Sequence, residues 1–431
     1  MSSPSSDERS QLGHPQLEFY CRIRPTTVEE NQGQSKKTKK TIGGATSRTS
    51  SHRKSIKSRK STPTGTKKRS KSPTRDDILN ESYSIFTTER AGDTVVAAEE
   101  PISNKIISSN LKGAGDIERF KHDILEGAHL FKFDKAFSPF YKQEKFYMET
   151  SKEACHHALQ GKNTLALFFG PTDGGKSYCL RGAEGRERGL TVRFCEDLMD
   201  LIKLERQASY RSAEKRVQVF VSIFQVHVDY MTDLLNVEKR TKLTQASDIH
   251  SLTEEIVRNP SDLTRHINNS LQARKIAAIH AGDRLQKFKS HFVVRFKIVQ
   301  KIKKSARHDL DTTSSTSYVD FVELAGSERV HPDMTPNEKE RHAISLTFNS
   351  INELLVALSM NRFSDIDKKV LRGSLLLELL KPSLNEFTNS IKLFTALAPT
   401  ELYFRQSVTA LSYSSKLHEV VRKFQGARDE I

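Results

Sequence analysis

The residues best suited to chemistry lie at positions 170–177. They read Gly-Pro-Thr-Asp-Gly-Gly-Lys-Ser, which matches the pattern G-x-x-x-x-G-K-S/T at every fixed position. In such a loop the glycines let backbone N–H groups close around phosphates, the lysine supplies a cation for the outer phosphates, and the serine hydroxyl can ligate Mg²⁺. We therefore expect a nucleoside triphosphate to bind through Lys176 and Ser177. The alternative is a glycine-rich turn without a ligand.

The flanking sequence predicts the strand and the helix that position this loop. Residues 164–169 are an apolar run of strand length, and the glycines follow directly. We expect a helix to begin near Lys176, so that the N–H groups of its first turn face the phosphates.

Apolar patterns along the remaining chain predict further elements. Strands are expected at 17–23, 131–137, 217–226, 291–299, 318–324 and 391–398. Helices are expected at 142–159, 190–204, 262–281, 344–358 and 406–421. Because strands alternate with helices, the predicted fold class is α/β: a phosphate-loop NTPase sandwich of three layers, with a mainly parallel or mixed central sheet and helices on both faces.

Composition argues against several classes of protein. Hydrophobic residues make up 36% of the 431 positions, enough for one large core or two domains. No run of about 18 apolar residues occurs, and the N-terminus lacks the apolar segment of a secretory signal. The four cysteines form no C-x-x-C pair, which suits a reducing compartment and argues against structural zinc. The sequence therefore predicts a cytoplasmic protein without a transmembrane segment.

One segment carries most of the positive charge. The formal net charge is +16, and residues 36–75 contain 15 lysines and arginines but no aspartate or glutamate. Residues 30–76 hold almost no large apolar side chains, so we expect a disordered basic insertion there. Such a segment can bind polyanions. Because no aromatic residues interleave with the bases, specific nucleic-acid recognition is not expected.

Several motifs that lie far apart together resemble the kinesin motor domain, from about Leu17 to Val421. They are R-x-R-P at 22–25, the phosphate loop with its aromatic neighbour at 169–178, a strand ending in D-L-L at 220–235, Ser-His at 290–291, L-A-G-S-E-R at 324–329 and a long helix at 344–358. The resemblance implies the kinesin motor fold over residues 16–422, interrupted by the insertion at about 30–76. Residues 1–15 are then a disordered N-terminus, and residues 423–431 a short tail.

The resemblance also implies an activity and its residues. Kinesins are ATPases that use ATP, ADP and Mg²⁺ and act on microtubules, so a cytoplasmic, cytoskeletal location is expected. Ser177 and Glu323 are the implied metal ligands. The implied catalytic residues are Lys176, Ser177, Glu323, Gly326, Glu328 and Ser290. The implied nucleotide-binding residues are Arg22, Arg24, Pro25, Gly170, Pro171, Thr172, Asp173, Gly174, Gly175, Lys176, Ser177 and Tyr178.

The first switch segment departs from the family pattern, which reads N-x-x-S-S-R-S-H. Aligned on Ser290 and His291, Arg284 replaces the asparagine, and Lys287 and Phe288 replace two serines that help to hold Mg²⁺ and water in the family. Phenylalanine cannot coordinate a cation, and lysine repels one. The alternative for the new lysines is a solvated loop surface.

Other replacements concern the carboxylates. Lys289 stands where the family has an arginine that pairs with the second switch, so a Lys289–Glu328 pair is expected to lack the bidentate fork. Glu323 stands in place of an aspartate, and Asp320 is interpreted as a structural strand residue. Asp173 either weakens nucleotide binding through its charge or caps the following helix.

The surface that faces the microtubule in kinesins is also altered. In the family pattern Y-R-D-S-K-L/M-T, Gly373 replaces the carboxylate and Leu375 the lysine. The remaining candidate contacts are Lys239, Arg240, Lys242, Lys339, Arg341, Lys368, Lys369 and Arg372. Tubulin is acidic, so these bases and the basic insertion are expected to contact it in a salt-sensitive way. The alternative for each single base is a solvated charged rim.

Three functions remain open at this point. The first is an active kinesin ATPase that moves on or attaches to microtubules. The second is a non-motile kinesin-fold structural protein, with or without nucleotide. The third, an unrelated phosphate-loop enzyme with a nucleic-acid-binding tail, requires the motifs to be coincidences. The intact Gly175-Lys176-Ser177 and Gly326 favour nucleotide binding, whereas the replaced serines predict slow hydrolysis. No coiled coil for self-dimerisation is evident.

Overall fold

The structure is a computed structural model. It describes residues 15–27, 84–87, 91–98, 128–183, 185–208, 214–228, 230–236, 252–280, 289–303, 312–331, 333, 335, 337–360, 362, 370–385 and 387–429. The expected N-terminal segment up to residue 14 and the basic insertion at 30–76 lie outside these residues.

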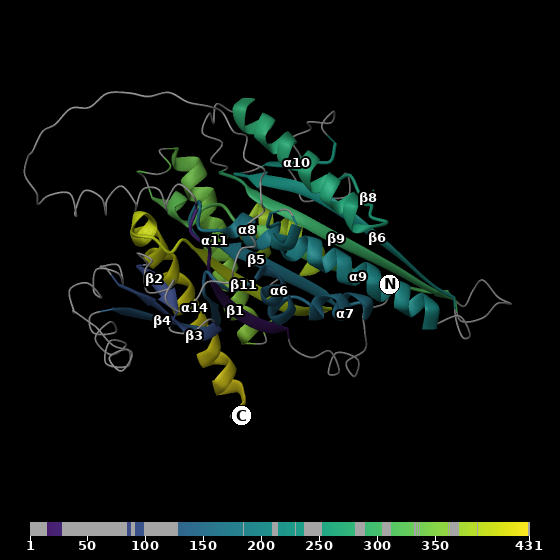
Figure 1. Cartoon of the computed structure of the whole chain (residues 1–431), viewed down its shortest axis with the longest axis horizontal. Helices are drawn as coiled ribbons and strands as arrows, with labels where there is room; N and C mark the ends of the chain where they lie inside the picture. Colours follow the sequence, from purple (N-terminus) through teal and green to yellow (C-terminus); the bar gives the residue numbers. More distant parts are fainter. Residues whose placement is uncertain are drawn as a thin grey trace, which may run out of the picture.

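One mixed β-sheet forms the middle layer of the fold (Figure 1). Its strands are β1 (Gln16–Ile23), β2 (Ile85–Thr87), β3 (Ala91–Ala97), β4 (His129–Phe137), β5 (Asn163–Phe169), β6 (Glu214–His227), β7 (Tyr230–Asp233), β8 (Glu255–Ile256), β9 (His291–Lys303), β10 (Thr312–Glu323) and β11 (Thr388–Leu397). Their order is β2-β3-β4-β1-β11-β5-β10-β9-β6-β7, and β8 pairs with β6. The central neighbours from β4 to β10 pair in parallel, whereas the outer pairs are antiparallel.

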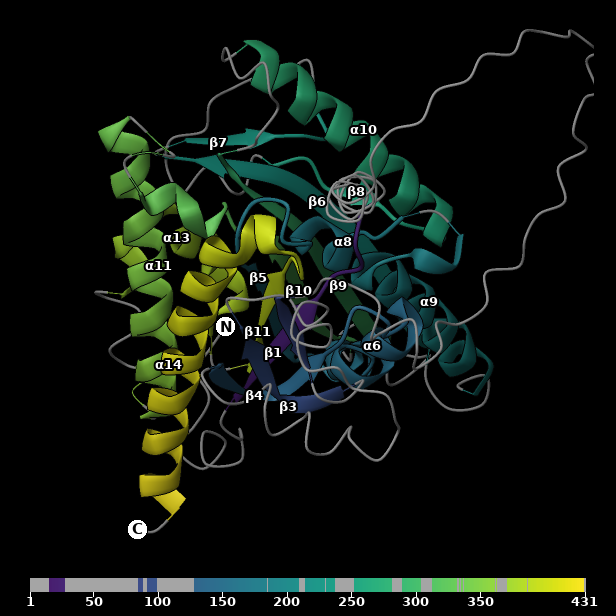
Figure 2. The same cartoon turned by 60° about the vertical axis from the view of Figure 1, so that its left-hand side comes forward.

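Helices cover both faces of this sheet. They are α6 (Gln143–Thr150), α7 (Glu153–Leu159), α8 (Lys176–Leu180), α9 (Leu190–Ala208), α10 (Pro260–His280), α11 (Glu338–Ser359), α13 (Leu375–Leu380) and α14 (Phe404–Asp429). On one face α11 and α14 pack side by side, with α13 against α11 (Figure 2). On the other face α6, α7, α9 and α10 enclose a second core. The predicted three-layer α/β sandwich with a mixed sheet is therefore confirmed.

Strand β5 lies at the centre of the sheet and contributes to both cores. Leu165, Leu167 and Phe169 belong to the core under α11 and α14, while Ala166 and Phe168 belong to the core under α9. A strand that is buried on both faces reads as a continuous apolar run, which is how this segment appears in the sequence. The end of β5 is consequently held on both sides.

Residues 142–159 are mostly helical, as expected, but the structure divides them into two helices, α6 and α7. Helix α6 ends at Thr150, and its C-cap residue Ser151 leaves helical geometry at φ −136° and ψ −8°. Thr150 donates its hydroxyl to the Phe146 carbonyl oxygen at 2.7 Å, within the last turn. The break lets Phe146 of α6 and Ala154 of α7 enter the same core.

Helix α14 extends beyond the expected end at Val421 to Asp429, so that residues 423–429 continue the helix. Arg422 explains part of this extension, because its guanidinium donates to the Leu17 carbonyl oxygen at 3.0 Å and to both carboxylate oxygens of Asp134. His418 lies 2.9 Å from the same carboxylate. These contacts fix the helix against β1 and β4.

A buried ion pair ties β9 to β10. Arg295 donates from Nε and Nη2 to the two carboxylate oxygens of Asp320 at 2.9 and 2.8 Å. Asp320 is fully buried, and it also accepts from the Ser383 hydroxyl at 2.5 Å. The interpretation of Asp320 as a structural strand residue is confirmed by these contacts.

Within the described ranges, none of the helices combines the length and the apolar character that a bilayer crossing requires. The four cysteines are buried and free of disulfides.

Candidate functional site

The predicted phosphate loop connects β5 to α8 at the carboxyl end of the central strand. Helix α8 begins at Lys176, where the sequence places it. Gly170 and Gly174 are required by close packing, since a Cβ on either would lie 2.2 or 2.5 Å from the Ala396 carbonyl oxygen of β11. Gly175 adopts a left-handed φ of 104°. The loop is thus pressed against the neighbouring parallel strand.

Lys176 closes the loop on itself. Its Nζ donates to the carbonyl oxygens of Gly170 at 2.8 Å and Pro171 at 2.6 Å, and the side chain is buried. Burial lowers the pKa of this ammonium group, while the nearby carboxylates of Glu323 and Glu328 act in the opposite direction. The loop therefore contains a buried ammonium group that is bonded to backbone carbonyl oxygens.

Ser177 and Glu323 meet across the site. The Ser177 hydroxyl at the start of α8 donates to Oε1 of Glu323 at 2.7 Å, and Glu323 is the last residue of β10. A hydroxyl and a carboxylate are hard oxygen ligands, and protein Mg²⁺ sites typically combine one or two carboxylates with substrate phosphates. The donor set fits Mg²⁺, and the additional methylene of Glu323 does not prevent the contact.

Glu328 faces the phosphate loop. It lies in the 3-10 helix η6 (Ser327–Val330), and its Oε2 accepts the Thr172 backbone N–H at 2.9 Å. Its Oε1 accepts the Thr172 hydroxyl and lies 3.3 Å from Nε of Arg329. A Cβ on Gly326 would lie 2.5 Å from both carboxylate oxygens. The second switch is therefore bonded directly to the loop.

The expected Lys289–Glu328 pair is wrong. Lys289 donates instead to Oε2 of Glu340 in the first turn of α11, at 3.0 Å. His227 approaches the other oxygen of Glu340 at 3.7 Å. The lysine thus connects the end of the first switch to α11 rather than to the second switch.

The two arginines of the R-x-R-P motif are placed differently. Arg24 packs over Gly175, and its Nε donates to the Asp173 carbonyl oxygen at 2.6 Å. Arg22 is buried, donates from Nη1 to Gln143 at 2.7 Å, and lies 5.2 Å from the ring centroid of Tyr178. Arg24 therefore supports the loop directly, while Arg22 supports the aromatic residue that follows it. Pro25 is adjacent to Arg24.

Asp173 does not cap the helix. The residue at the N-cap of α8 is Gly175, which makes no side-chain cap hydrogen bond. Asp173 is exposed and has a left-handed φ of 63°, a conformation that aspartate tolerates better than most residues. The capping alternative is wrong, and the charge of Asp173 lies at the rim of the loop.

Ser290 is buried, and two neighbouring side chains hold its hydroxyl. Its hydroxyl donates to Gln225 at 3.0 Å and accepts from Arg274 at 3.1 Å. The neighbouring His291 accepts the Ala325 backbone N–H on Nδ1 at 3.1 Å, and burial lowers the pKa of His291 to about 3. The ring is therefore neutral, and it links the first switch to the strand end that carries the second.

Sequence reasoning missed two residues of this region. Arg274 of α10 is buried behind Ser290, and burial lowers its pKa to about 10, with Glu323 acting in the opposite direction. Gln143 of α6 joins Arg22 to the Tyr178 carbonyl oxygen, to which it donates at 2.7 Å. Neither lies in a motif. Only their spatial position identifies them.

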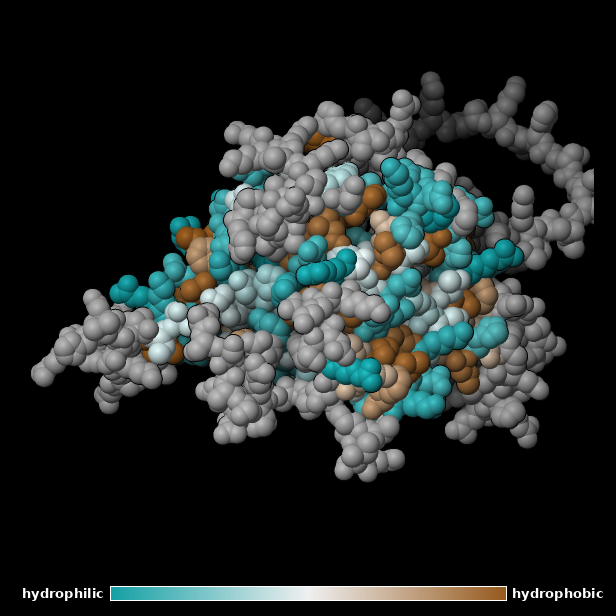
Figure 3. All heavy atoms as spheres, turned by 180° about the vertical axis from the view of Figure 1, so that it is seen from behind, coloured by the Kyte–Doolittle hydropathy of each residue, from teal (hydrophilic) through white to brown (hydrophobic). Residues whose placement is uncertain are grey.

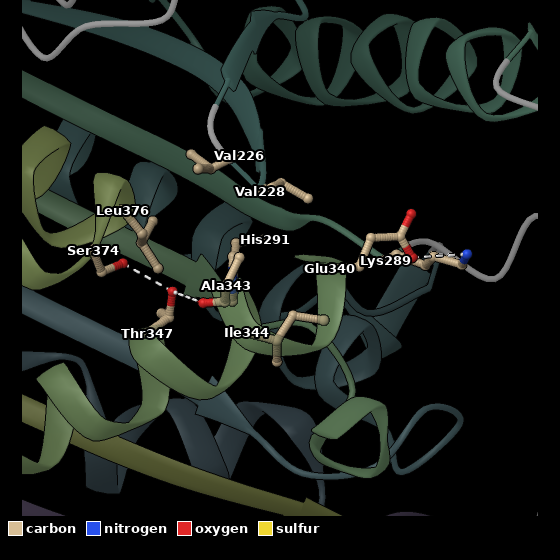
Figure 4. Close-up of a pocket in the computed structure, with 10 residues that line it drawn as sticks. All are labelled: Val226, Val228, Lys289, His291, Glu340, Ala343, Ile344, Thr347, Ser374 and Leu376. Carbon is tan, nitrogen blue, oxygen red and sulfur yellow. Dashed lines mark hydrogen bonds and ion pairs between the residues drawn. The ribbon is translucent and has the colours of Figure 1, made fainter. Parts of the chain in front are cut away.

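A small pocket separates the end of the first switch from α11 (Figure 4). Lys289 and Glu340 face each other at one end, and Thr347 of α11 bonds Ser374 at 2.8 Å near the other. Mostly apolar side chains lie between them. The pocket lies where the end of the first switch meets α11.

Three of the candidate contact bases lie near this helix. Lys339 is exposed and Arg341 half-buried in the first turns of α11, and Arg372 is exposed in η8 (Leu371–Gly373). Gly373 holds η8 against α11, because a Cβ there would lie 2.5 Å from the Ser350 hydroxyl. The candidates Lys239, Arg240, Lys242, Lys368 and Lys369 lie outside the described residues, as do Arg284, Lys287 and Phe288.

Figure 3 shows the molecule from behind the view of Figure 1. On the described part of this face, polar and apolar residues lie side by side.

Comparison with known proteins gives consistent results. Residues 89–420 match the family model described as kinesin motor domain. The chain is 25% identical over 299 residues to Protein claret segregational of Drosophila melanogaster, which covers 68% of this chain and 40% of that protein. It is 26% identical over 297 residues to Kinesin-like protein KIF1C of Homo sapiens, covering 65% of this chain and 26% of that protein. The chain therefore spans less than half the length of these relatives.

A solved structure has a similar fold. It is a KIF14 dimer in a two-heads-bound state with AMP-PNP, in complex with a microtubule. The TM-score is 0.59 at 19% sequence identity, and the match covers 94% of both chains. This similarity supports the fold described above.

Proposed function

Because this chain belongs to the kinesin motor domain family, we propose that it is a microtubule-binding protein whose central site binds ATP or ADP with Mg²⁺ and hydrolyses ATP slowly. The observation that carries this proposal is the 2.7 Å contact between Ser177 and Glu323 beside the closed loop of Lys176. It brings a hydroxyl, a carboxylate and an ammonium together at the carboxyl end of a central strand. Nucleotides bind at this place in α/β folds.

Different residues of the site would bind the phosphates, the metal ion and the remainder of the nucleotide. Lys176 and the N–H groups of residues 170–177 would hold the phosphates, while Ser177 and Glu323 would hold Mg²⁺. Arg24, Pro25 and Tyr178 border the loop and would hold the remainder of the nucleotide. When bound, Mg²⁺ supplies the positive charge that stabilises phosphoryl transfer.

Slow hydrolysis follows from the contacts of the two switches. Glu328 bonds the phosphate loop and Lys289 bonds Glu340, so these two residues do not join the switches to each other. The Ser290 hydroxyl is engaged by Gln225 and Arg274. Glu328 and Ser290 would therefore act as catalytic groups only after these bonds rearrange, and Gly326 would contribute its backbone N–H.

The microtubule is the proposed partner, through the surface around α11. Lys339, Arg341 and Arg372 give this surface positive charge, and tubulin is acidic. The basic insertion at 30–76 would add contacts with acidic tubulin tails. The domain would extend over residues 16–422, and the protein would be located in the cytoplasm on the cytoskeleton.

A second candidate is a non-motile structural protein that binds microtubules on the kinesin fold, with or without nucleotide. The observation that favours it is that internal groups already satisfy Lys176 and the Thr172 N–H. A loop satisfied in this way can persist without a ligand.

The two candidates are separated by measuring phosphate release with and without microtubules, beside a Lys176→Ala control. Co-sedimentation with microtubules is measured in parallel in ATP and in AMP-PNP. Slow, microtubule-stimulated turnover that Lys176→Ala abolishes supports the first candidate. Equal binding in both nucleotides without any turnover supports the second.

A further inference from the structure

Three strands of the sheet continue past the strands that flank them. The pairing of β9 with β6 reaches Glu214 and its pairing with β10 reaches Thr312, whereas β5 pairs with β10 only from Val319 onward. Figure 1 shows β6 and β9 extending together past β8. We call residues 214–218, 299–303 and 312–317 the outer arm. On the side of β5, no strand of the described ranges pairs with β10 within the outer arm.

The free side of β10 presents backbone hydrogen-bonding groups. Along a strand, alternate residues direct their N–H and C=O groups to the same side. Tyr318 donates its N–H to Oδ1 of Asn163, the first residue of β5, at 2.8 Å. The same alternation directs the N–H and C=O groups of Thr316 and Ser314 to that side. An extended peptide that lies in line with β5 can therefore pair with them.

The side chains of this edge do not protect it against pairing. Natural edge strands are usually protected by charged residues, by proline or by a bulge. Residues 312–317 read Thr-Thr-Ser-Ser-Thr-Ser, residues 313–316 are exposed, and their pairing with β9 proceeds residue by residue. At the other side of the outer arm, β6 begins with the charged residues Glu214, Lys215 and Arg216. Only the β6 edge thus carries the protective charges.

Two cations lie beside the β10 edge on one face of the outer arm. The register places Arg216 opposite Lys301, and Lys301 opposite Ser314. Like charges that lie directly opposite each other destabilise a sheet, so an anion nearby would be stabilising. Lys301 is exposed, and no residue that the structure describes forms an ion pair with it. A strand added beside β10 would lie about 10 Å from β9, and the long Lys301 side chain can reach toward it across the short Ser314.

An exposed aromatic residue lies at the inner end of the same edge. The Phe387 carbonyl oxygen accepts the Asn163 N–H at 2.8 Å, and Phe387 is 43% exposed. Because Asn163 also bonds Tyr318, a peptide in line with β5 would begin or end near Phe387. An apolar side chain at that end of the peptide would remove apolar surface from water.

From these features we propose that the outer arm binds an extended acidic segment of a partner protein, which adds to the sheet as a strand beside β10. The backbone of the segment pairs with Ser314 and Thr316, its carboxylates face Lys301, and an apolar side chain contacts Phe387. In this mode of recognition, main-chain hydrogen bonds give affinity and alternate side chains give specificity. The inference goes beyond the proposed function, because it uses neither the phosphate loop nor the surface around α11.

The test is fluorescence anisotropy of a short labelled peptide of alternating glutamate and valine, titrated with the full chain without nucleotide or microtubules. A peptide of the same sequence with an N-methylated backbone keeps the charges and loses the backbone donors. We expect the unmodified peptide to bind and the N-methylated peptide to bind about tenfold more weakly, because about two hydrogen bonds are lost. A peptide of alternating lysine and valine should also bind more weakly, because its charges repel Lys301.

Two pairs of variants test the edge and the charge. Thr316→Pro removes the N–H on the free side, where an edge strand tolerates proline, and its control Thr316→Val keeps that N–H. Thr316→Pro should weaken binding of the glutamate peptide about threefold to tenfold, and Thr316→Val less than about twofold. Lys301→Glu should weaken binding about fivefold at low salt. Its control is Lys203→Glu, the same change of net charge at an exposed position of α9, which should leave the affinity unchanged.

Each outcome supports or overturns the proposal. It is wrong if the glutamate peptide does not bind, if the N-methylated peptide binds equally well, or if Lys301→Glu and Lys203→Glu have the same affinity. Self-association of the wild type that Thr316→Pro abolishes, measured by light scattering, would assign the edge to a second copy of the chain and also overturn it. Thermal unfolding of each variant is recorded, and the N-methylated peptide decides the result if Thr316→Pro does not fold. Because no nucleotide or microtubule is present, a failure here leaves the proposed function standing.

Discussion

Replacing Arg295 by methionine removes one partner of the buried ion pair between β9 and β10. In the wild type, Asp320 is fully buried and accepts two hydrogen bonds from Arg295 and one from Ser383. The same guanidinium donates to the Leu379 carbonyl oxygen at 2.9 Å. In the variant, Asp320 keeps only the hydrogen bond from Ser383, and the Leu379 carbonyl oxygen loses the hydrogen bond from Arg295.

The expected cost follows from the uncompensated charge. Breaking a buried ion pair by removing one partner typically lowers the free energy of unfolding by about 3–5 kcal/mol. Methionine fills a similar volume, so the cavity contribution is small. The double variant Arg295→Met with Asp320→Val removes both charges. It should be less destabilised than Arg295→Met alone, because apolar replacement of a whole pair is often nearly neutral.

The assay is urea unfolding followed by far-ultraviolet circular dichroism, because the chain contains no tryptophan. The control is Lys203→Met, which removes an exposed pair with Asp200 whose side chains are about 70% exposed. That change should cost less than about 0.5 kcal/mol. The structural role of the pair would be refuted if Arg295→Met lowered the free energy of unfolding by less than about 1 kcal/mol. It would also be refuted if the double variant were less stable than Arg295→Met.

Three further predictions concern the candidate site. The variant His291→Asn keeps an acceptor for the Ala325 N–H. In the folded wild type, the pKa of His291 is lowered to about 3. Below about pH 6.5 the unfolded chain therefore binds a proton at His291 that the folded chain does not bind, and stability falls. Wild-type stability should therefore fall by about 1 kcal/mol between pH 7.5 and 5.5, and less in the variant, in urea unfolding at both pH values. Gly174→Ala should lower stability by about 1–3 kcal/mol, because the new Cβ would lie 2.5 Å from the Ala396 carbonyl oxygen; unaffected thermal unfolding would contradict this. Ser177→Ala should weaken Mg²⁺-dependent nucleotide binding about tenfold and leave binding in EDTA unchanged, as measured by titration with labelled ADP.

Much of the fold was predictable because its signals are local. The apolar run before Gly170 becomes the central strand β5, and α8 begins at Lys176 as the motif requires. Strand alternation and helical periodicity indicate which face of each element is buried. The layers of the sandwich pack together through these buried faces. The sequence did not predict the break between α6 and α7 or the extension of α14, because both depend on contacts with distant segments. Examples are Phe146 in a shared core and Arg422 at the Leu17 carbonyl oxygen.

For the candidate site, the sequence by itself determined which chemical groups are present: the glycines of the loop, Lys176, Ser177, Glu323 and the carboxylate of Glu328. The tertiary structure decided how these groups pair. It directs Glu328 to Thr172 and leaves Lys289 to Glu340. A charged side chain bonds the nearest group that the packed backbone presents, and that proximity is set by segments far apart in the chain. Residue types therefore follow from sequence, and the partner of each charge follows from packing.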